Sequence, residues 1–163
     1  MLHLIPAPIH RRLYRLADKV RRRWWTIRRP RRNSVIVAAF DEAGRVLLVR
    51  HSYGPPVWAL PGGSMNRREE PAAAAEREFR EELGCPLDNI VLLSELTQNE
   101  SGSADRLHVF MAQVAGTPKA DMREILAADF FDPERLPRPA DHRVPRWVGE
   151  AAAARRDPGS EQR

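Results

Sequence analysis

The chain has 163 residues, of which 42% are hydrophobic and 30% charged, and its formal net charge is +5; this length favours one domain with a hydrophobic core. No apolar run reaches the roughly 20 residues of a transmembrane helix, and the first residues lack the basic and then apolar pattern of a secretory signal, so neither an integral membrane protein nor a secreted one is expected. Cys85 is the only cysteine, which excludes an internal disulfide and fits a cytoplasmic location. We expect Cys85 itself to be a small, buried hydrophobic residue.

The positive charge is concentrated at the N-terminus. Residues 1–32 hold eleven Arg and Lys residues and one acid, a net charge of +10, so the remainder carries −5. Apolar residues recur there at steps of three and four, which predicts a basic amphipathic helix over residues 9–27. We expect residues 1–32 to form an arm that docks on the domain or on the second subunit of a homodimer, binds an anionic membrane surface, or binds RNA.

Residues 34–51 have the pattern of a β-hairpin. Two β-branched and apolar runs, SVIVAAF and RVLLVRH, are joined by the turn sequence DEAG. After the loop SYGPP, the run VWAL at residues 57–60 predicts a short strand. This strand leads directly into the turn PGG at residues 61–63.

A helix is predicted to begin at Pro71 and to close at Gly84. Proline is favoured in the first turn of a helix, and glycine is favoured just beyond the last turn. Steps of three and four give this helix one apolar face and one acidic face. The predicted buried face consists of Ala72, Ala75, Phe79 and Leu83, and the acidic face consists of Glu78, Glu81 and Glu82.

The second half of the chain predicts more strands and a final helix. Residues 89–96 and 106–115 are apolar on both faces and are expected to be central strands. The polar connection between them, residues 97–105, is expected to be a mobile loop. Residues 124–131 predict a short strand or turn, and residues 142–156 predict a C-terminal helix.

Strands that flank one helix and precede another indicate a mixed sheet between helical layers, which is an α/β fold. The predicted organisation is therefore a basic arm at residues 1–32, a globular domain at residues 33–155 and a disordered tail at residues 156–163.

Three glutamates at the end of the predicted helix break two local rules. Glu78, Glu81 and Glu82 are like charges three and four residues apart, which repel each other on a helix. They also face the negative end of the helix dipole. A bound Mg²⁺ or Mn²⁺ ion would offset both effects, and these ions prefer oxygen ligands. At Gly63, the absence of a side chain would allow a backbone carbonyl oxygen to act as a further ligand. The alternative is an acidic face that is only solvated.

Residues 63–85 resemble the signature of the Nudix hydrolase family, the MutT-like enzymes. That signature is Gly, five residues, Glu, seven residues, Arg-Glu, an apolar residue, any residue, Glu-Glu, any residue, Gly and an apolar residue. The chain fills every fixed position, with cysteine in place of the usual Ile, Leu or Val as the one mild departure. The matching residues are Gly63, Glu69, Arg77, Glu78, Phe79, Glu81, Glu82, Gly84 and Cys85.

The resemblance implies an α/β/α sandwich around a mixed sheet and the hydrolysis of a diphosphate linkage, typically in a nucleoside diphosphate joined to another group. It implies that Glu78 and Glu82 bind Mg²⁺ or Mn²⁺. Glu81 would be a further ligand or the base that deprotonates water, and the Gly63 carbonyl would be an additional ligand. Glu69 and Arg77 would support the loop and the helix through an ion pair.

Further site residues are expected outside the signature. Some Nudix enzymes use a late-loop glutamate as base or extra ligand, and Glu124 resembles that position, the alternative being a solvated loop acid. Arg50 and His51 end a strand near the glycine turn and either contact phosphate or base or are simply exposed. Trp58 either stacks on a nucleobase or belongs to the core.

The sequence is compatible with several classes of nucleotide substrate. Sequence markers of the subfamilies for ADP-ribose, dinucleoside polyphosphates and coenzyme A are absent, which leaves a nucleoside triphosphate, a nucleotide sugar, or a capped or triphosphorylated RNA end. An RNA 5′-end pyrophosphohydrolase is therefore one alternative. A Nudix domain that senses a nucleotide without cleaving it is another, although the complete set of carboxylates favours an enzyme.

Overall fold

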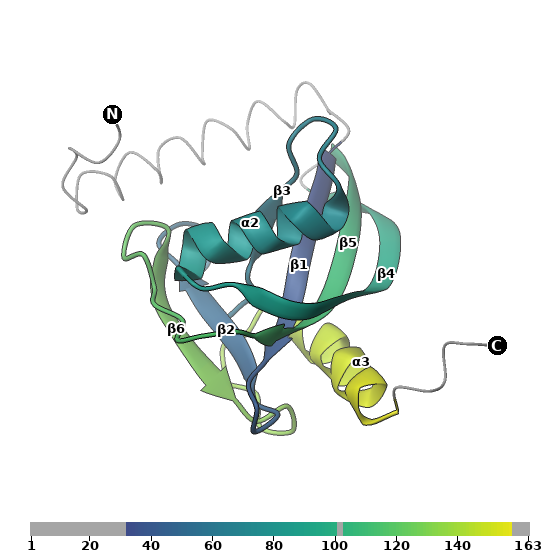
Figure 1. Cartoon of the computed structure of the whole chain (residues 1–163). Coiled ribbons are helices and arrows are strands. Elements are labelled where there is room, and N and C mark those ends of the chain that lie inside the picture. Colours follow the sequence, from purple (N-terminus) through teal and green to yellow (C-terminus); the bar gives the residue numbers. More distant parts are fainter. Residues whose placement is uncertain (1–31, 101–102, 158–163) are drawn as a thin grey trace.

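The computed structural model describes residues 32–100 and 103–157 (Figure 1). In chain order the elements are β1 (Arg32–Phe40), β2 (Val46–His51), β3 (Gly62–Ser64), α2 (Pro71–Leu83), β4 (Leu87–Glu100), β5 (Ser103–Val114), β6 (Ile125–Phe131) and α3 (Val144–Arg156). The predicted basic helix at residues 9–27 lies outside the described residues, as does nearly all of the predicted arm and tail. Within the described ranges, no helix combines the length and the apolar character needed to cross a membrane.

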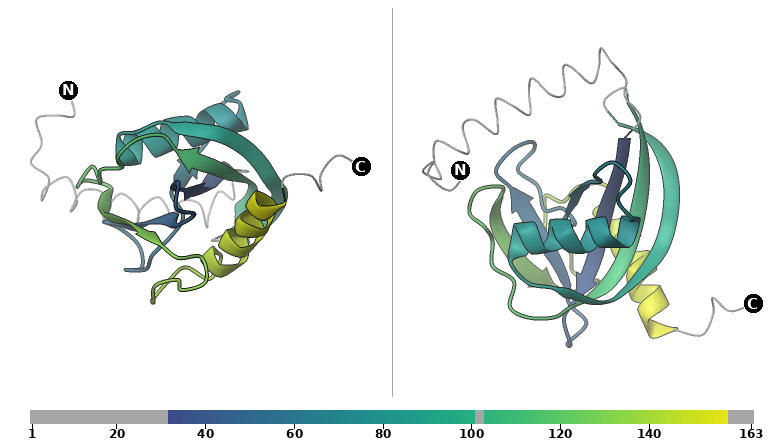
Figure 2. Two further views of the ribbon diagram at one scale, coloured as in Figure 1. Left: turned by 60° about the horizontal axis from the view of Figure 1, so that its bottom comes forward. Right: turned by 45° about the horizontal axis from the view of Figure 1, so that its top comes forward.

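The strands form one mixed sheet in the order β4-β5-β1-β2-β6, and β3 pairs with β1. β1 and β5 run parallel, whereas the other paired strands run antiparallel. α2 covers one face of the sheet and α3 covers the other (Figure 2). The predicted α/β fold with a central mixed sheet between helical layers is confirmed.

The sheet divides the hydrophobic core into two clusters. Consecutive residues of a strand point to opposite faces, so Leu47 and Val49 of β2 pack with Phe79 of α2, whereas Leu48 packs with Trp147 of α3. These five side chains are at most 2% exposed. Burial of apolar surface on both faces therefore holds each helix against the sheet.

The predicted hairpin is present only at its turn. β1 pairs with β2 at Phe40 and Val46, and the two strands diverge beyond that pair. Residues 59–64 lie between them, with backbone hydrogen bonds to Val49 on one side and to Val37 on the other. The short strand predicted just before the PGG turn is therefore displaced onto the glycines themselves, as β3.

Two predictions about the later strands were wrong. β4 lies at the edge of the sheet, although it was expected to be central, and Val91 and Leu92 are 40% and 47% exposed. The polar segment at residues 97–105 was expected to be a loop, but β4 and β5 continue through most of it and pair as far as Glu100 and Ser103. Antiparallel pairing satisfies the backbone there, so the strands extend without apolar side chains.

α2 has the predicted ends but a slightly different buried face. It begins at Pro71, and Gly84 ends it in the left-handed conformation at φ 69°. Ala74 is buried and Ala72 is exposed, so the apolar stripe starts later than the spacing predicted. Glu82 is also buried, and it is the only charged residue among the buried residues of this helix.

Candidate active site

Two glycines let β3 approach both the sheet and α2. A Cβ atom on Gly62 would collide with the carbonyl oxygen of Val35 in β1. A Cβ atom on Gly63 would collide with the carboxylate of Glu78. The Glu78 carboxylate therefore occupies the space that a side chain at position 63 would fill, which explains why this turn needs glycine.

Glu82 is the most enclosed carboxylate of α2. It is 4% exposed, its Oε2 accepts a hydrogen bond from the Gly62 N–H at 3.1 Å, and its Oε1 lies 4.0 Å from His51 Nδ1. Burial raises the pKa of Glu82 well above its ordinary value, and the charges of Glu78 and Glu124 raise it further. An ionised carboxylate in this position is costly unless a cation compensates it.

The three helix carboxylates differ in depth. Glu78 is 17% exposed at its side chain, and burial raises its pKa although the adjacent Arg77 opposes that shift. Glu81 is 61% exposed at its side chain, and its Oε2 lies 3.3 Å from Arg77 Nη1. Glu78 and Glu82 therefore form the inner part of the site, and Glu81 forms its outer rim.

Arg77 forms the ion pair with Glu69 that the sequence predicted. Arg77 Nε and Nη2 donate to the two oxygens of Glu69, and the backbone N–H of Asn66 donates to Glu69 Oε2 at 2.7 Å. These hydrogen bonds, that of Arg77 first, lower the pKa of Glu69 to about 2. Arg77 Nη2 also donates to the carbonyl oxygen of Ser64, so the loop after β3 is tied to α2.

The loop before β6 brings Glu124 to the same region. The carbonyl oxygen of Glu124 accepts a hydrogen bond from the Ser52 N–H at 2.7 Å, at the end of β2. The negative charge of Glu124 contributes to the raised pKa of both Glu78 and Glu82, after burial, which has the largest effect.

Asp121 is a residue of this region that the sequence reasoning missed. Its carboxylate accepts hydrogen bonds from the backbone N–H groups of Arg123, Glu124 and Ile125. The sequence offered only a weak signal, because a loop aspartate commonly accepts hydrogen bonds from nearby backbone N–H groups.

The structure separates the three residues that were expected to contact substrate. His51 lies on the α2 side of β2, near Glu82, and burial lowers its pKa. Arg50 points to the opposite side, where its guanidinium lies 5.8 Å from the centroid of the Trp58 ring. Trp58 packs edge-to-face on Phe131 within the α3 cluster. Arg50 and Trp58 are therefore not brought together with the glutamates.

The chemistry of the inner carboxylates fits a divalent cation. Glu78 and Glu82 supply hard oxygen atoms, and a positive ion would offset both their burial and their mutual repulsion. Among residues 32–100 and 103–157, however, no three His, Cys, Asp or Glu side chains stand close enough together to hold a metal ion as they are.

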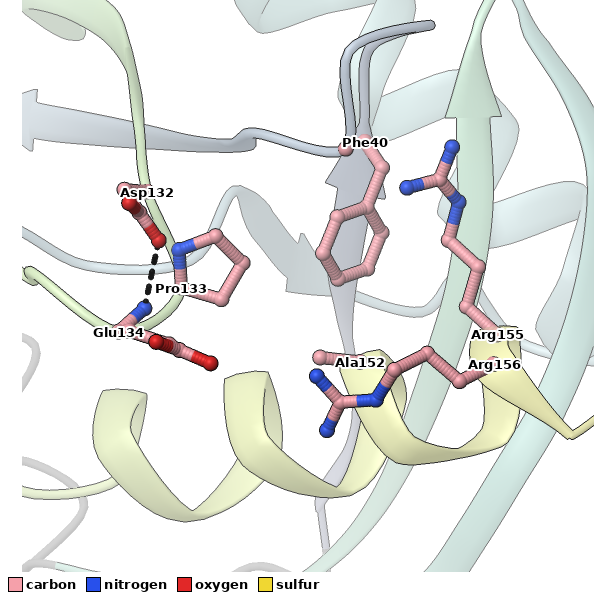
Figure 3. Close-up of a pocket in the computed structure, with 8 residues that line it drawn as sticks. Phe40, Asp132, Pro133, Glu134, Ala152, Arg155 and Arg156 are labelled. Atoms are coloured by element: carbon pink, nitrogen blue, oxygen red, sulfur yellow. Dashed lines mark hydrogen bonds between the residues drawn. The ribbon is translucent and has the colours of Figure 1, made fainter.

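A hollow lies apart from these carboxylates, on the α3 side of the sheet. It has a volume of about 230 Å³. Figure 3 shows Asp132 and Glu134 on one side of it and Arg155 and Arg156 of α3 on the other, next to Phe40. The sheet separates this hollow from the carboxylates of α2.

One family model matches a range of residues that includes every residue of the candidate site. A model described as NUDIX domain matches residues 30–151. The chain is 32% identical over 98 residues to an ADP-ribose pyrophosphatase of Mycobacterium tuberculosis, covering 56% of this chain and 47% of that protein. It is 38% identical over 73 residues to an RNA pyrophosphohydrolase of Acidiphilium cryptum, covering 42% of this chain and 43% of that protein. The chain spans less than half the length of these two curated relatives.

The fold is also similar to a solved structure. The crystal structure of a MutT NUDIX hydrolase from Burkholderia pseudomallei matches with a TM-score of 0.67 and 27% sequence identity. The match covers 74% of this chain and 98% of that chain.

Proposed function

Because the chain belongs to the NUDIX domain family, we propose that it is a metal-dependent hydrolase that cleaves a diphosphate linkage in a nucleoside diphosphate joined to another group. The observation that carries this proposal is the placement of the Glu78 and Glu82 carboxylates against the glycines of β3. Two inward carboxylates on one rigid helix are suited to hold a cation beside a phosphate group.

We propose that Glu78 and Glu82 bind Mg²⁺ or Mn²⁺, with Glu81 or the Gly63 carbonyl as further ligands. The cation, when bound, supplies positive charge that offsets the negative charge of the diphosphate oxygens. In the hydrolysis, a water oxygen bonds to phosphorus while the bond from phosphorus to the bridging oxygen breaks. A carboxylate accepts the proton of the water, and Glu124 and Glu81 are our candidates for this base.

The neighbouring residues support the proposed site in different ways. Arg77 and Glu69 hold the loop after β3 against α2, which keeps the carboxylate ligands in place. His51, which lies near Glu82, is our candidate for a contact with the substrate. Arg50 and Trp58 lie on the other side of β2, so we propose that they contact only a substrate group that reaches around the end of this strand.

A hydrolysis assay on the full chain tests the proposal. The substrates are ADP-ribose, a nucleoside triphosphate, a nucleotide sugar and a 5′-triphosphorylated RNA, and phosphate release is followed with a coupling phosphatase or pyrophosphatase. We expect release from at least one substrate with Mg²⁺ and none with EDTA. Tight nucleotide binding without release would instead support a sensing domain that does not cleave its ligand.

An RNA 5′-end pyrophosphohydrolase is the second candidate function. It is supported by the similarity to an RNA pyrophosphohydrolase and by the eleven basic residues in positions 1–32. Deletion of residues 1–30 tests it. Loss of RNA hydrolysis with retained hydrolysis of small nucleotides would support the RNA function, whereas parallel loss of both activities would count against it.

The same deletion tests the other proposed partners of the basic segment. Loss of binding to vesicles of anionic lipid would support attachment to a membrane surface. Loss of a dimer, measured by light scattering, would support docking on a second subunit. We propose a cytoplasmic location, which fits a sequence with a single cysteine and hence no internal disulfide.

A further inference from the structure

The loop between β5 and β6 is fastened to the end of α2. The Lys119 N–H donates to the carbonyl oxygen of Leu83 at 2.8 Å, and the Asp121 N–H donates to that of Glu82 at 3.3 Å. These carbonyls belong to the last turn, where an α-helix lacks internal donors. The loop therefore caps the end of the helix that carries the buried carboxylate.

The same loop is fastened to β2 a few residues later. The Ser52 N–H, which follows His51 at the end of this strand, donates to the Glu124 carbonyl oxygen. The backbone from Asp121 to Glu124 is therefore held between the two elements that carry the inner site residues. A change in the path of this short segment would move the Glu124 side chain relative to the carboxylates of α2.

The Asp121 carboxylate determines that path. Its Oδ1 accepts hydrogen bonds from the N–H groups of Arg123 at 2.9 Å, Glu124 at 3.0 Å and Ile125 at 2.8 Å. Met122, within the turn, has φ 59°, a conformation that residues with side chains rarely adopt. The three hydrogen bonds to the Asp121 side chain compensate for the cost of this backbone conformation.

We propose that Asp121 is a positioning residue that holds the Glu124 carboxylate beside Glu78 and Glu82. The inference rests on the proposed function, because Glu124 affects a reaction only if this site is catalytic. Asp121 is a further acidic residue next to the end of α2, where its N–H bonds to the Glu82 carbonyl oxygen. A further acid beside Glu82 is unfavourable by itself, and the three hydrogen bonds to the turn give the physical reason for an acceptor oxygen in this position.

Variants of Asp121 separate its hydrogen bonds from its charge. Asp121→Asn keeps an acceptor oxygen for the turn but removes the charge, whereas Asp121→Ala removes both. Asp132→Ala is the matched control, because the Asp132 carboxylate also accepts a backbone hydrogen bond, from Glu134 at 2.9 Å, but in the turn after β6. We expect Asp121→Ala to lower kcat about tenfold to a hundredfold with a smaller change in KM. Asp121→Asn and Asp132→Ala should retain most of the activity.

A double-mutant cycle shows whether Asp121 acts through Glu124. We expect Glu124→Gln alone to lower kcat, and Asp121→Ala to slow the Glu124→Gln enzyme far less than it slows the wild type. If Asp121→Ala lowered kcat by the same factor in the wild type and in Glu124→Gln, the proposal would be overturned. It would also be overturned if Asp121→Asn were as slow as Asp121→Ala, because charge rather than position would then be decisive.

Two readouts do not depend on activity. Hydrogen exchange at the amides of residues 123–125 should become faster in Asp121→Ala and return to the wild-type rate in Asp121→Asn. Mn²⁺ affinity should fall in Asp121→Ala by the same factor as in Glu124→Gln. If the wild-type chain hydrolysed nothing while both readouts changed as expected, the proposed function would fail and the positioning role would stand. Unchanged exchange and Mn²⁺ affinity in Asp121→Ala would overturn the positioning role itself.

Discussion

The guanidinium of Arg77 binds both oxygens of the Glu69 carboxylate, with Nε 2.7 Å from Oε1 and Nη2 2.9 Å from Oε2. The same guanidinium donates to the Ser64 carbonyl oxygen at 3.1 Å and to Glu78 Oε1 at 2.8 Å. One side chain therefore ties the loop after β3 to α2 and orients a proposed metal ligand. This role requires the planar fork of arginine rather than positive charge alone.

Replacing Arg77 with lysine tests that requirement. Lysine cannot reproduce the paired hydrogen bonds, so the loop and the Glu78 carboxylate lose their fixed positions. We expect kcat to fall about tenfold to a hundredfold. Arg80→Lys is the matched control, because Arg80 lies on the same helix and pairs with Glu76 at the surface. Equal kcat values in the two variants would contradict the role given to Arg77.

Substitution of Gly63 tests the close approach of β3 to α2. In Gly63→Ala the new Cβ would collide with the Glu78 carboxylate, which is the flexible end of a side chain and can move away. We therefore expect a folded protein with reduced hydrolysis and reduced Mn²⁺ affinity. Gly149→Ala in α3, where a Cβ meets nothing within 4 Å, should keep full activity and gain about 0.5–1 kcal/mol of stability. Wild-type Mn²⁺ affinity in Gly63→Ala would refute the interpretation.

Local sequence signals predicted α2 closely, whereas long-range pairing limited the prediction of the sheet. Pro71 and Gly84 mark helix ends because each acts through its own backbone conformation. The insertion of residues 59–64 between β1 and β2 depends on tertiary packing, which an alternating pattern does not report. The edge position of β4 was missed for the same reason, since hydrophobicity along a strand does not identify its neighbours.

The candidate site shows the same limit. Helical spacing placed Glu78, Glu81 and Glu82 together, but only the packed structure shows that Glu82 is buried while Glu81 is mostly exposed. The position of the sheet sets this difference in depth. Asp121 escaped prediction because its partners are backbone N–H groups of an irregular turn, which produce no periodic pattern in the sequence.

The Glu69 carboxylate predicts a specific pH dependence of stability. Hydrogen bonds from Arg77 and Asn66 lower its pKa from the ordinary value of 4.5 to about 2. The ionised form therefore stabilises the folded state fully above pH 4.5, and this contribution is lost as the pH falls toward about 2. We expect Glu69→Gln to have a lower Tm than the wild type at pH 7, and the difference to shrink across this range. Circular dichroism measures the Tm of both proteins as a function of pH. A Tm difference that stays constant with pH would contradict the lowered pKa of Glu69.

Glu82 is expected to lower stability in the absence of metal. Glutamine at this position keeps an acceptor for the Gly62 N–H and removes the buried charge. In EDTA, we expect Glu82→Gln to unfold at a higher temperature than the wild type, by about 2–4 °C for each kcal/mol of relieved charge burial. Mg²⁺ should raise the Tm of the wild type only. A lower Tm for Glu82→Gln in EDTA would show that the carboxylate is compensated by the protein itself.

Calorimetric titration with Mn²⁺ shows directly whether Glu78 and Glu82 hold a divalent cation. The comparison is between the wild type, Glu78→Gln, Glu82→Gln and the surface control Glu76→Gln on the same helix. We predict that the wild type and Glu76→Gln bind Mn²⁺ equally, and that Glu78→Gln and Glu82→Gln bind it about tenfold more weakly or worse. Equal Mn²⁺ affinity in all four proteins would show that Glu78 and Glu82 do not bind the cation.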